Sequence, residues 1–366
     1  MKIGIVGIRG VPNYHGGFEQ FTESLSEFLV NEDNEVYVYN SHNHPYQKPI
    51  WKGVNIIHKY DPEFKIGTAG QFIYDLNCII DARKRNFDII LQLGYTSSSL
   101  WYKFMPKKPI VITNMDGLEW KRSKYPKIVQ KFLKRAEKWA VKSSDYLISD
   151  SIGIQKYLQD KYNKTSTYIA YGASLFTNED KIILDKYKVK AYDYNILIAR
   201  MEPENNIETI LDGVTSSKKR RIFLVVGKND VNDFGKRLTI KYKNNKNIVF
   251  LGGVYNQNHL DNLRYFSNLY FHGHSVGGTN PSLIEAMASN ALVVANNNVF
   301  NKAILEENGL YFSNKDDVKK ILENTSKKDH LLKLEGNHDK ILNQFSKQKI
   351  NKKYLNLFKE VLSEKK

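Results

Sequence analysis

The sequence predicts an α/β protein made of two doubly wound domains, each with a parallel sheet covered by helices. Short apolar runs alternate with helix-length segments, which is the pattern of parallel sheets buried on both faces. This series occurs twice within 366 residues, a length too great for one hydrophobic core. Each half also carries a glycine-rich turn between a predicted strand and a predicted helix, where doubly wound folds bind their ligands.

The predicted strands fall into two series with a boundary near Tyr171 to Ala173. The strands of the two halves are residues 2–8, 35–39, 54–57, 89–92, 110–113, 146–149 and 167–170, then 195–199, 222–226, 248–251, 269–271 and 292–295. We therefore predict an N-terminal domain over residues 1–172 and a C-terminal domain over residues 173–346. Residues 347–366 are predicted to form an amphipathic helix that packs back on the first domain or simply finishes the second. Because ligands bind beyond the carboxyl ends of such strands, we expect the site in a cleft between the domains.

Composition excludes several classes of protein. No run of about 18 apolar residues is present, so no transmembrane helix is expected. The apolar start ends in a glycine turn and predicts a first strand rather than a signal peptide. The single Cys78 excludes an internal disulfide framework and fits a reducing cytoplasm. The net charge of +16 implies an anionic partner, such as a phosphorylated substrate, a membrane surface or nucleic acid.

The stretch from His272 to Ala288 predicts a strand, a glycine turn and a helix start. Asn280 can cap that helix, and Pro281 suits its first position. A helix N-terminus after a glycine turn binds anions, so Gly277, Gly278 and Thr279 are predicted to contact a phosphate. Glu285 would repel a phosphate, and it is better placed to accept hydrogen bonds from a ribose. The alternative is a capping box formed by Ser282 and Glu285, which would only close the helix start.

A second glycine loop follows the first predicted strand. Gly4, Gly7 and Gly10 have the wrong spacing for a dinucleotide fold, and Asn40 stands where a ribose-binding acid would be expected, so a nicotinamide cofactor is disfavoured. Gly16 and Gly17 directly precede a predicted helix at residues 18–29. They are either a plain turn or a second anion-binding loop, and two such loops suit a diphosphate.

Three segments carry a family resemblance: residues 7–12 with 16–19, residues 116–122, and residues 199–206 together with 272–288. On these residues the chain resembles the retaining glycosyltransferase family 4, which has the GT-B fold of two facing Rossmann-like domains. It is most similar to the rhamnosyltransferase-like branch of bacterial capsule and cell-wall polysaccharide synthesis. The resemblance implies that the backbone of Gly16 and Gly17 approaches the donor phosphates and that Glu285 binds the nucleotide ribose.

The resemblance also assigns Arg200 to neutralising the donor diphosphate, a task suited to its fixed guanidinium fork. The alternative is a surface ion pair with Glu202 or Glu204. The family's usual lysine is replaced here by Asn205, for which Lys228 could compensate.

The first acid of the family's motif is replaced by Gly277. This departure and the replacement of the lysine fit a deoxysugar donor, and they equally fit a weakened enzyme.

Three further polar residues are candidates for positioning the sugar or the acceptor. Asp116 and Glu119 follow the predicted strand 110–113, and His15 lies on the opposite loop. A solvated or capping role is the alternative for each of them. Arg200 and the helix N-termini can stabilise the leaving diphosphate. With no Asp-x-Asp signature, no metal and no other cofactor is expected.

Residues 121–142 contain nine basic residues and one acid, Glu137. Apolar residues recur at helical spacing, and such a helix ordinarily packs its apolar face in the core and leaves a solvated basic face. The alternative is docking on anionic lipid through Lys131, Lys134, Arg135 and Lys138. A lipid-linked acceptor would bring the enzyme to the inner face of the cell membrane as a peripheral protein.

We therefore predict the transfer of L-rhamnose from dTDP-rhamnose to a lipid-linked oligosaccharide in bacterial surface polysaccharide synthesis. The rival hypotheses are a UDP- or GDP-sugar donor and a noncatalytic protein that binds a sugar nucleotide. Charge alone suggests a nucleic-acid-binding protein, but no binding motif supports it, so no nucleic acid partner is expected. No oligomeric state follows from the sequence.

Overall fold

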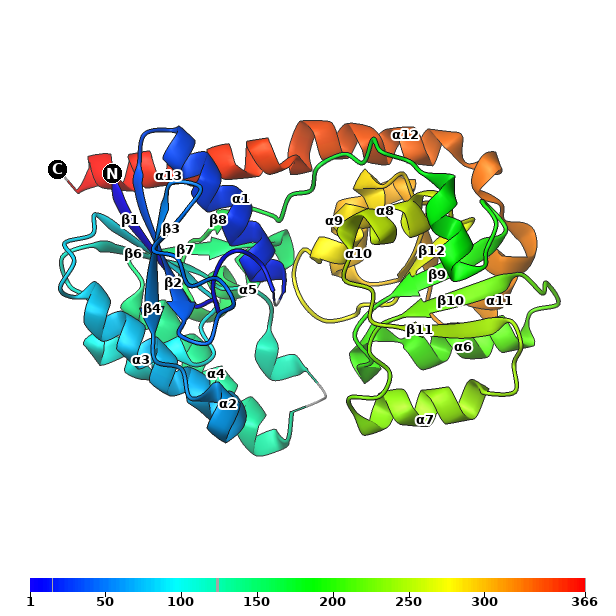
Figure 1. Cartoon of the computed structure of the whole chain (residues 1–366), viewed down its shortest axis with the longest axis horizontal. Coiled ribbons are helices and arrows are strands. Elements are labelled where there is room, and N and C mark those ends of the chain that lie inside the picture. Colours follow the sequence, from blue (N-terminus) through cyan, green and yellow to red (C-terminus); the bar gives the residue numbers. More distant parts are fainter. Residues whose placement is uncertain (15, 123–124, 366) are drawn as a thin grey trace. The chain divides into compact units, whose positions relative to one another are not determined.

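The chain, as a computed structural model, is described for residues 1–14, 16–122 and 125–365. It consists of two compact domains. The N-terminal domain contains residues 1–121, 125–171 and 347–366, and the C-terminal domain contains residues 172–346 together with Arg122. Each has its own parallel sheet with helices on both faces (Figure 1), which confirms the predicted fold class.

The N-terminal sheet has the strand order β3-β4-β2-β1-β5-β6-β7-β8. Its strands are β1 (Lys2–Val6), β2 (Glu35–Ser41), β3 (Ile50–Trp51), β4 (Val54–Lys59), β5 (Ile89–Leu93), β6 (Ile110–Asn114), β7 (Tyr146–Ser149) and β8 (Thr167–Tyr168). β3 pairs with β4 in an antiparallel hairpin, and the other neighbours pair in parallel. Strands β1, β5 and β6 are almost wholly buried, as expected for a sheet that is covered on both faces.

Helices of the N-terminal domain cover both faces of this sheet (Figure 1). The α-helices are α1 (Gly17–Asn31), α2 (Glu63–Ile66), α3 (Gly70–Ala82), α4 (Lys127–Ser143), α5 (Ile152–Tyr162) and α13 (Lys347–Glu364). Short 3₁₀-helices are η1 (Gly67–Ala69), η2 (Ser98–Phe104) and η3 (Glu119–Lys121). α1 and α13 lie on one face, and α3 and α4 lie on the other with η2 between them.

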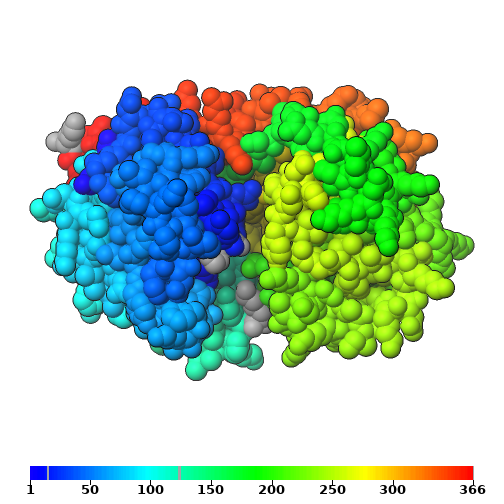
Figure 2. Space-filling view, in the orientation of Figure 1, coloured from blue at the N-terminus to red at the C-terminus, as the bar shows by residue number. Residues whose placement is uncertain are grey.

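The last helix, α13, belongs to the N-terminal domain although it ends the chain. The amide of Asn351 donates to the carbonyl and the hydroxyl of Ser24 at 3.0 Å each. The hydroxyl of Tyr354 accepts from Asn114 at 2.9 Å, and its ring centroid lies 4.9 Å from that of Phe21. In Figure 2 the red residues of this helix accordingly lie beside blue residues of the same domain.

The C-terminal sheet has the strand order β11-β10-β9-β12-β13-β14, and its neighbouring strands pair in parallel. The strands are β9 (Tyr194–Ile198), β10 (Ile222–Val226), β11 (Ile248–Gly252), β12 (Leu269–His272), β13 (Val293–Asn296) and β14 (Leu310–Phe312). Leu197, Phe223, Phe271 and Val294 are fully buried in one cluster that forms the core on one face of this sheet. Counted along the domain, the order is 3-2-1-4-5-6, the arrangement of doubly wound dinucleotide-binding sheets.

Helices on opposite faces of the C-terminal sheet form two groups. The α-helices are α6 (Ile207–Ser216), α7 (Asp233–Tyr242), α8 (Gln257–Tyr265), α9 (Pro281–Ala288), α10 (Val299–Leu305), α11 (Lys315–Asn324) and α12 (Leu331–Lys340). The shorter helices are η4 (Lys181–Tyr187), η5 (Pro203–Asn205), η6 (Glu306–Asn308), η7 (Lys327–Asp329) and the π-helix η8 (Ile341–Phe345). α6, α7 and α11 cover one face, while α8, α9 and α12 cover the other (Figure 1).

The strand order places the carboxyl ends of β9 and β12 side by side, although β10 and β11 lie between them in sequence. Tyr270 of β12 pairs with Ile196 of β9, and Phe271 pairs with Leu197. Such a point, where the strand order reverses, is where doubly wound sheets bind ligands. A ligand site is therefore expected at the loops after β9 and β12.

The sequence-based strand predictions were wrong mainly at short or terminal segments. β3 and β14 were not predicted, because two- and three-residue strands carry no readable periodicity. The predicted strand 2–8 ends at Val6, since Gly7 turns the chain with φ +91°. The predicted strand 167–170 shortens to Thr167–Tyr168.

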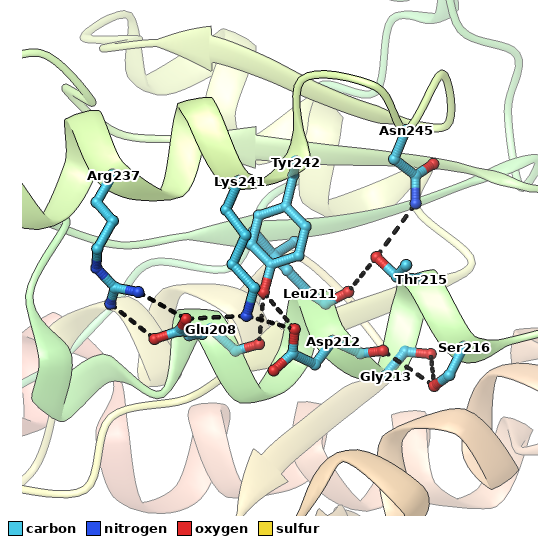
Figure 3. A network of polar contacts seen from close by, with 10 residues as sticks. All are labelled: Glu208, Leu211, Asp212, Gly213, Thr215, Ser216, Arg237, Lys241, Tyr242 and Asn245. Atoms are coloured by element: carbon cyan, nitrogen blue, oxygen red, sulfur yellow. Dashed lines mark hydrogen bonds and ion pairs between the residues drawn. The ribbon is translucent and has the colours of Figure 1, made fainter.

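A network of charged side chains joins α6 to α7 on the surface of the C-terminal domain (Figure 3). Arg237 donates two hydrogen bonds to the carboxylate of Glu208, at 2.8 and 2.7 Å. Lys241 donates to Glu208 at 2.9 Å and to Asp212 at 2.7 Å. The hydrogen bonds from Arg237 and then Lys241 lower the pKa of Glu208 to about 2.

We expect Glu208→Gln to remove part of the acid sensitivity of the domain. Since the folded pKa lies below the ordinary value of 4.5, the network stabilises the fold fully above that pH. This stabilisation is lost as the pH falls from 4.5 towards 2. The Tm difference between wild type and Glu208→Gln should therefore shrink on acidification from pH 6 to pH 3. Glu335→Gln, at an exposed position, is the matched control, and a pH-independent difference for Glu208→Gln would contradict the prediction.

Candidate functional site

Direct contacts join the loops that follow β9 and β12. The backbone N–H of Ser275 donates to the carbonyl of Glu204 at 3.0 Å, and its hydroxyl donates to the same oxygen at 2.8 Å. The amide of Asn206 donates to the carbonyl of Gly273 at 2.8 Å. A Cβ on Gly273 would lie 1.9 Å from the carbonyl oxygen of Asn205, so only glycine permits this approach.

The start of α9 lies in the second of these loops. Asn280 is the N-cap, its side-chain oxygen accepts from the backbone N–H of Ser282 at 3.0 Å, and Pro281 is the first helical residue. This confirms the predicted helix start. Gly278 and Thr279 directly precede the cap, so the positive end of the helix dipole lies at this turn. Within the helix, Pro281 has no N–H, and the N–H groups of Ser282 and Leu283 bond to Asn280.

The capping-box interpretation of Glu285 was wrong. A capping box requires the serine at the N-cap and the acid three residues later. Here Asn280 takes the cap, so Ser282 is already helical and its hydroxyl bonds with the hydroxyl of Tyr270 at 2.7 Å. The carboxylate of Glu285 is therefore free of the helix start.

Glu285 instead contacts an arginine of α8 that lies 21 residues earlier in the chain. Nη2 of Arg264 donates to Oε2 of Glu285 at 2.6 Å, and Nη1 donates to Asp261 at 2.9 Å. Burial alone would lower the pKa of Arg264, but the charges of Glu285 and Asp261 outweigh burial and raise it. The hydroxyl of Ser289 donates to the same Asp261 oxygen at 3.0 Å. Glu285 thus lies in a part-buried cluster of one arginine and two carboxylates.

Arg200 lies at the carboxyl end of β9 and is exposed. Among the described residues, it forms no ion pair with Glu202 or Glu204, so the ion-pair alternative finds no support. Its charge influences the loop after β12, where it helps to lower the pKa of His274. The guanidinium is therefore available to an anion beside the start of α9.

Asn205 stands where the resemblance predicts a lysine, and its side chain binds the backbone. It is almost fully buried, and its amide donates to the carbonyl of Arg200 at 2.8 Å. This bond fixes the turn that presents Arg200. The Asn205 amide is thus bound to the protein backbone rather than directed toward a ligand.

Lys228 lies on the neighbouring loop, after β10. Its Nζ lies 5.5 Å from the ring centroid of Tyr255, and the residue is exposed. The loop touches the one after β9, since a Cβ on Gly227 would lie 2.0 Å from the carbonyl oxygen of Ala199. A second positively charged side chain therefore follows β10, the strand that pairs with β9, after which Arg200 lies.

Gly277 adopts φ +124° with nothing within 4 Å of its missing Cβ. Side chains other than glycine rarely take this conformation, so a glutamate here would be strained although space is available. The backbone conformation of this turn thus favours glycine at the position where the resemblance predicts an acid.

Sequence reasoning missed two histidines beside the same turn. His272 ends β12, and its ring stacks on that of His274 with centroids 4.4 Å apart. Neither ring nitrogen of His272, nor Nδ1 of His274, has a hydrogen-bond partner among the described residues. Burial lowers the pKa of His272, and burial together with Arg200 lowers that of His274 to about 3. Both rings are neutral at physiological pH. The His-x-His spacing at the end of a predicted strand is the sequence feature that could have identified these two histidines.

In the N-terminal domain, an acidic side chain lies in the helical turn that follows the predicted anion-binding loop. Gly16 is the N-cap of α1 and Gly17 its first residue. In the first turn, the buried carboxylate of Glu19 accepts from the backbone N–H of Arg9 at 3.1 Å. The side chain of Arg9 is itself paired with Glu63 at 2.8 Å. This carboxylate would oppose a phosphate at the start of α1.

Asp116 lies near α1, whereas Glu119 lies in a segment that packs against α4. Asp116 follows β6 at φ +48°, and its N–H donates to the side chain of Asn114 at 2.9 Å. Its carboxylate is hydrogen-bonded to the buried hydroxyl of Tyr171, whose ring lies 6.2 Å from that of Phe18 in α1. Glu119 begins η3, which packs against α4. His15 lies outside the described residues.

The basic helix α4 packs one face in the core, as the ordinary interpretation expected. Leu133, Ala136 and Ala140 are buried, whereas the four predicted basic residues are exposed: Lys131, Lys134, Arg135 and Lys138. Lys134 lies 4.6 Å from the ring centroid of Trp120.

The one acid of the stretch, Glu137, is buried. It accepts hydrogen bonds from Tyr157, Tyr162 and Lys161 at 2.6–2.7 Å and from Trp120 at 3.0 Å. The charged side chains exposed on α4 are therefore all basic.

Within residues 1–14, 16–122 and 125–365, no cluster of three or more histidine, cysteine or acidic side chains could hold a metal ion. Over the same residues, no helix combines the length and the apolar character needed to cross a membrane.

Comparisons with known proteins bear on both domains. Residues 180–349 match the family model described as glycosyl transferases group 1. The C-terminal domain is thus a group 1 glycosyltransferase domain. Residues 1–174 match a separate model, described as a domain of unknown function, DUF1972. No curated protein sequence matches the chain.

Solved structures similar to the whole chain have the same GT-B fold as this protein. Sucrose-phosphate synthase from Thermosynechococcus elongatus is 14% identical with a TM-score of 0.79, and the match covers 99% of each chain. Anabaena HepE, solved in complex with UDP, is 14% identical with a TM-score of 0.74 over 98% of this chain and 100% of its own. WaaG, a glycosyltransferase involved in lipopolysaccharide biosynthesis, is 12% identical with a TM-score of 0.68 over 98% of this chain and 99% of its own. At these identities the likeness shows the fold alone.

Proposed function

We propose that this protein is a retaining glycosyltransferase of family 4 that transfers L-rhamnose from dTDP-rhamnose to a lipid-linked oligosaccharide in bacterial surface polysaccharide synthesis. The observation that carries the proposal is the arrangement at the β9–β12 junction of the glycosyltransferase domain. There the exposed Arg200, the glycine turn at the start of α9 and the carboxylate of Glu285 come from loops that contact one another.

The chemistry of glycosyl transfer needs these groups. Negative charge grows on the leaving diphosphate as the bond to the anomeric carbon breaks. A guanidinium and the positive end of a helix dipole stabilise that charge without a metal ion. A carboxylate one and a half turns into the same helix can accept a hydrogen bond from the nucleotide ribose.

The preference for a deoxysugar donor rests on Gly277. A family member with an acid at this position could bind a sugar hydroxyl there, and this chain cannot place one without backbone strain. A UDP-sugar donor is the second candidate, favoured by the likeness to HepE, which has been solved in complex with UDP-glucose.

A donor screen with the purified protein tests the proposal. The expected result is rhamnosyl transfer from dTDP-rhamnose to a lipid acceptor in a membrane extract, read as a mass increase of one deoxyhexose. Transfer of glucose from UDP-glucose with none from dTDP-rhamnose would establish the second candidate. Calorimetry that detects no nucleoside diphosphate binding would count against any transferase.

We also propose that α4 docks the protein on anionic lipid at the inner face of the cell membrane. Its exposed face carries Lys131, Lys134, Arg135 and Lys138 with no exposed acid, and the apolar side chain of Ile128 at its start is 78% exposed. Basic residues near an anionic surface contribute about 1 kcal/mol each.

Changing these four basic residues together to glutamine should release the protein from anionic vesicles. We expect co-sedimentation with phosphatidylglycerol-containing liposomes at 0.1 M salt to fall at least tenfold, while the Tm stays unchanged because all four side chains are exposed. The control removes the same charge elsewhere, through glutamine at the exposed Lys84, Lys156, Lys352 and Lys359. Equal loss in both variants would mean that net charge alone, rather than α4, governs binding.

A further inference from the structure

Arg264 is the most deeply buried charge next to the proposed nucleotide site. Its side chain is 1% exposed, and its two terminal nitrogens each donate to a different carboxylate. A buried arginine shared between two acids is costly to desolvate unless both hydrogen bonds are kept. The pair with Glu285 is therefore expected to persist when a ligand binds.

The two carboxylate oxygens of Glu285 differ in their hydrogen-bond partners. Oε2 is bound to Arg264 at 2.6 Å, a short charge-assisted hydrogen bond. Oε1 has no partner among the described residues, and it is not one of their buried unpartnered atoms. The side chain is 17% exposed. Oε1 is thus the oxygen open to a ligand.

A carboxylate that binds a ribose through both vicinal hydroxyls uses one oxygen for each. With Oε2 committed to Arg264, Glu285 can offer an unshared oxygen to only one hydroxyl. A 2′-deoxyribose has a single free hydroxyl, at the 3′ position, and a ribose has one more.

We propose that Arg264 is a positioning residue that commits one oxygen of Glu285 to the protein, so that the site recognises one ribose hydroxyl. The site then binds 2′-deoxyribonucleoside diphosphates as tightly as the corresponding ribonucleotides. This inference rests on the proposed role of Glu285 in nucleotide binding. It makes a deoxyribonucleotide donor acceptable to the site without selecting it over a ribonucleotide.

Calorimetry with the full chain and three diphosphates tests the inference. dTDP and 5-methyl-UDP differ only in the 2′-hydroxyl, and 2′,3′-dideoxythymidine diphosphate lacks the 3′-hydroxyl as well. We expect Kd values for dTDP and 5-methyl-UDP within threefold of each other. The dideoxynucleotide should bind at least tenfold more weakly, because Oε1 is left unpaired.

A tenfold or greater preference for 5-methyl-UDP over dTDP would overturn the inference and leave the proposed transferase intact. Equal binding of the dideoxynucleotide would exclude Glu285 from hydroxyl recognition. If none of the three binds, the proposed function fails, and the inference fails with it.

The variant Arg264→Lys separates positioning from simple structural support. A lysine keeps the charge but cannot reach both carboxylates with a fixed fork. We expect the discrimination between dTDP and the dideoxynucleotide to fall below threefold. A purely structural arginine would lower the Tm and leave this ratio unchanged. If the variant does not fold, the comparison of three nucleotides on the wild-type protein still decides the inference.

Discussion

Replacing Arg200 by alanine should lower kcat/KM for glycosyl transfer about 100- to 1,000-fold, the range found when one preorganised charge-stabilising donor is removed. The guanidinium is exposed at the end of β9 and forms no ion pair among the described side chains, so its removal leaves no buried charge behind. Arg200→Ala should therefore lower the reaction rate and leave the fold and the Tm unchanged. Initial rates with the donor identified by the screen measure it, and circular dichroism with Tm checks the fold.

Two further variants make the Arg200 result specific. Arg200→Lys should recover part of the activity, because it restores the charge without the planar fork. Arg220→Ala removes an exposed arginine from the same domain and should leave the rate unchanged. An Arg200→Ala enzyme with more than half of the wild-type rate would remove this residue from the site.

Replacing Glu285 by glutamine should weaken nucleotide binding and also destabilise the domain. A hydrogen bond to a charged group contributes about 1.5–3 kcal/mol, which corresponds to a Kd increased roughly 10- to 100-fold. The variant also removes one of the two carboxylates that balance the buried Arg264. We expect a loss of about 1–3 kcal/mol in the free energy of unfolding, seen as a Tm lower by several degrees.

The matched control for Glu285→Gln is Asp261→Asn. It removes the other carboxylate of Arg264, and Asp261 belongs to α8 rather than to the helix that begins at the site. Asp261→Asn should therefore lower the Tm and leave the nucleotide Kd unchanged. If both variants weaken nucleotide binding equally, Glu285 acts through stability alone.

The local features of the site could be predicted because they depend on neighbours in sequence. Asn280 and Pro281 define the start of α9, since a capping side chain and a missing N–H act within one turn. Arg200 and the glycine turn could likewise be placed at the ends of their strands. The order of β9 and β12 in the sheet then brought them together, and no local pattern encodes that order.

The partners of the buried polar side chains could not be predicted. The amide of Asn205 turned to the carbonyl of Arg200, and Glu285 paired with an arginine on a different helix. The same holds for Glu137, whose four donors come from η3 and α5. Each buried polar group must find a partner, but which one it finds depends on the packed arrangement.

The sequence by itself determined the two α/β domains, the helix start at Asn280 and the basic character of α4, because hydrophobic periodicity, capping and charge are properties of short segments. Only the tertiary structure decided that α13 returns to the N-terminal domain, that Glu19 binds the backbone N–H of Arg9, and that one oxygen of Glu285 is held by Arg264. The physical reason is desolvation: a charge removed from water must be compensated by whichever group the fold brings within hydrogen-bonding distance.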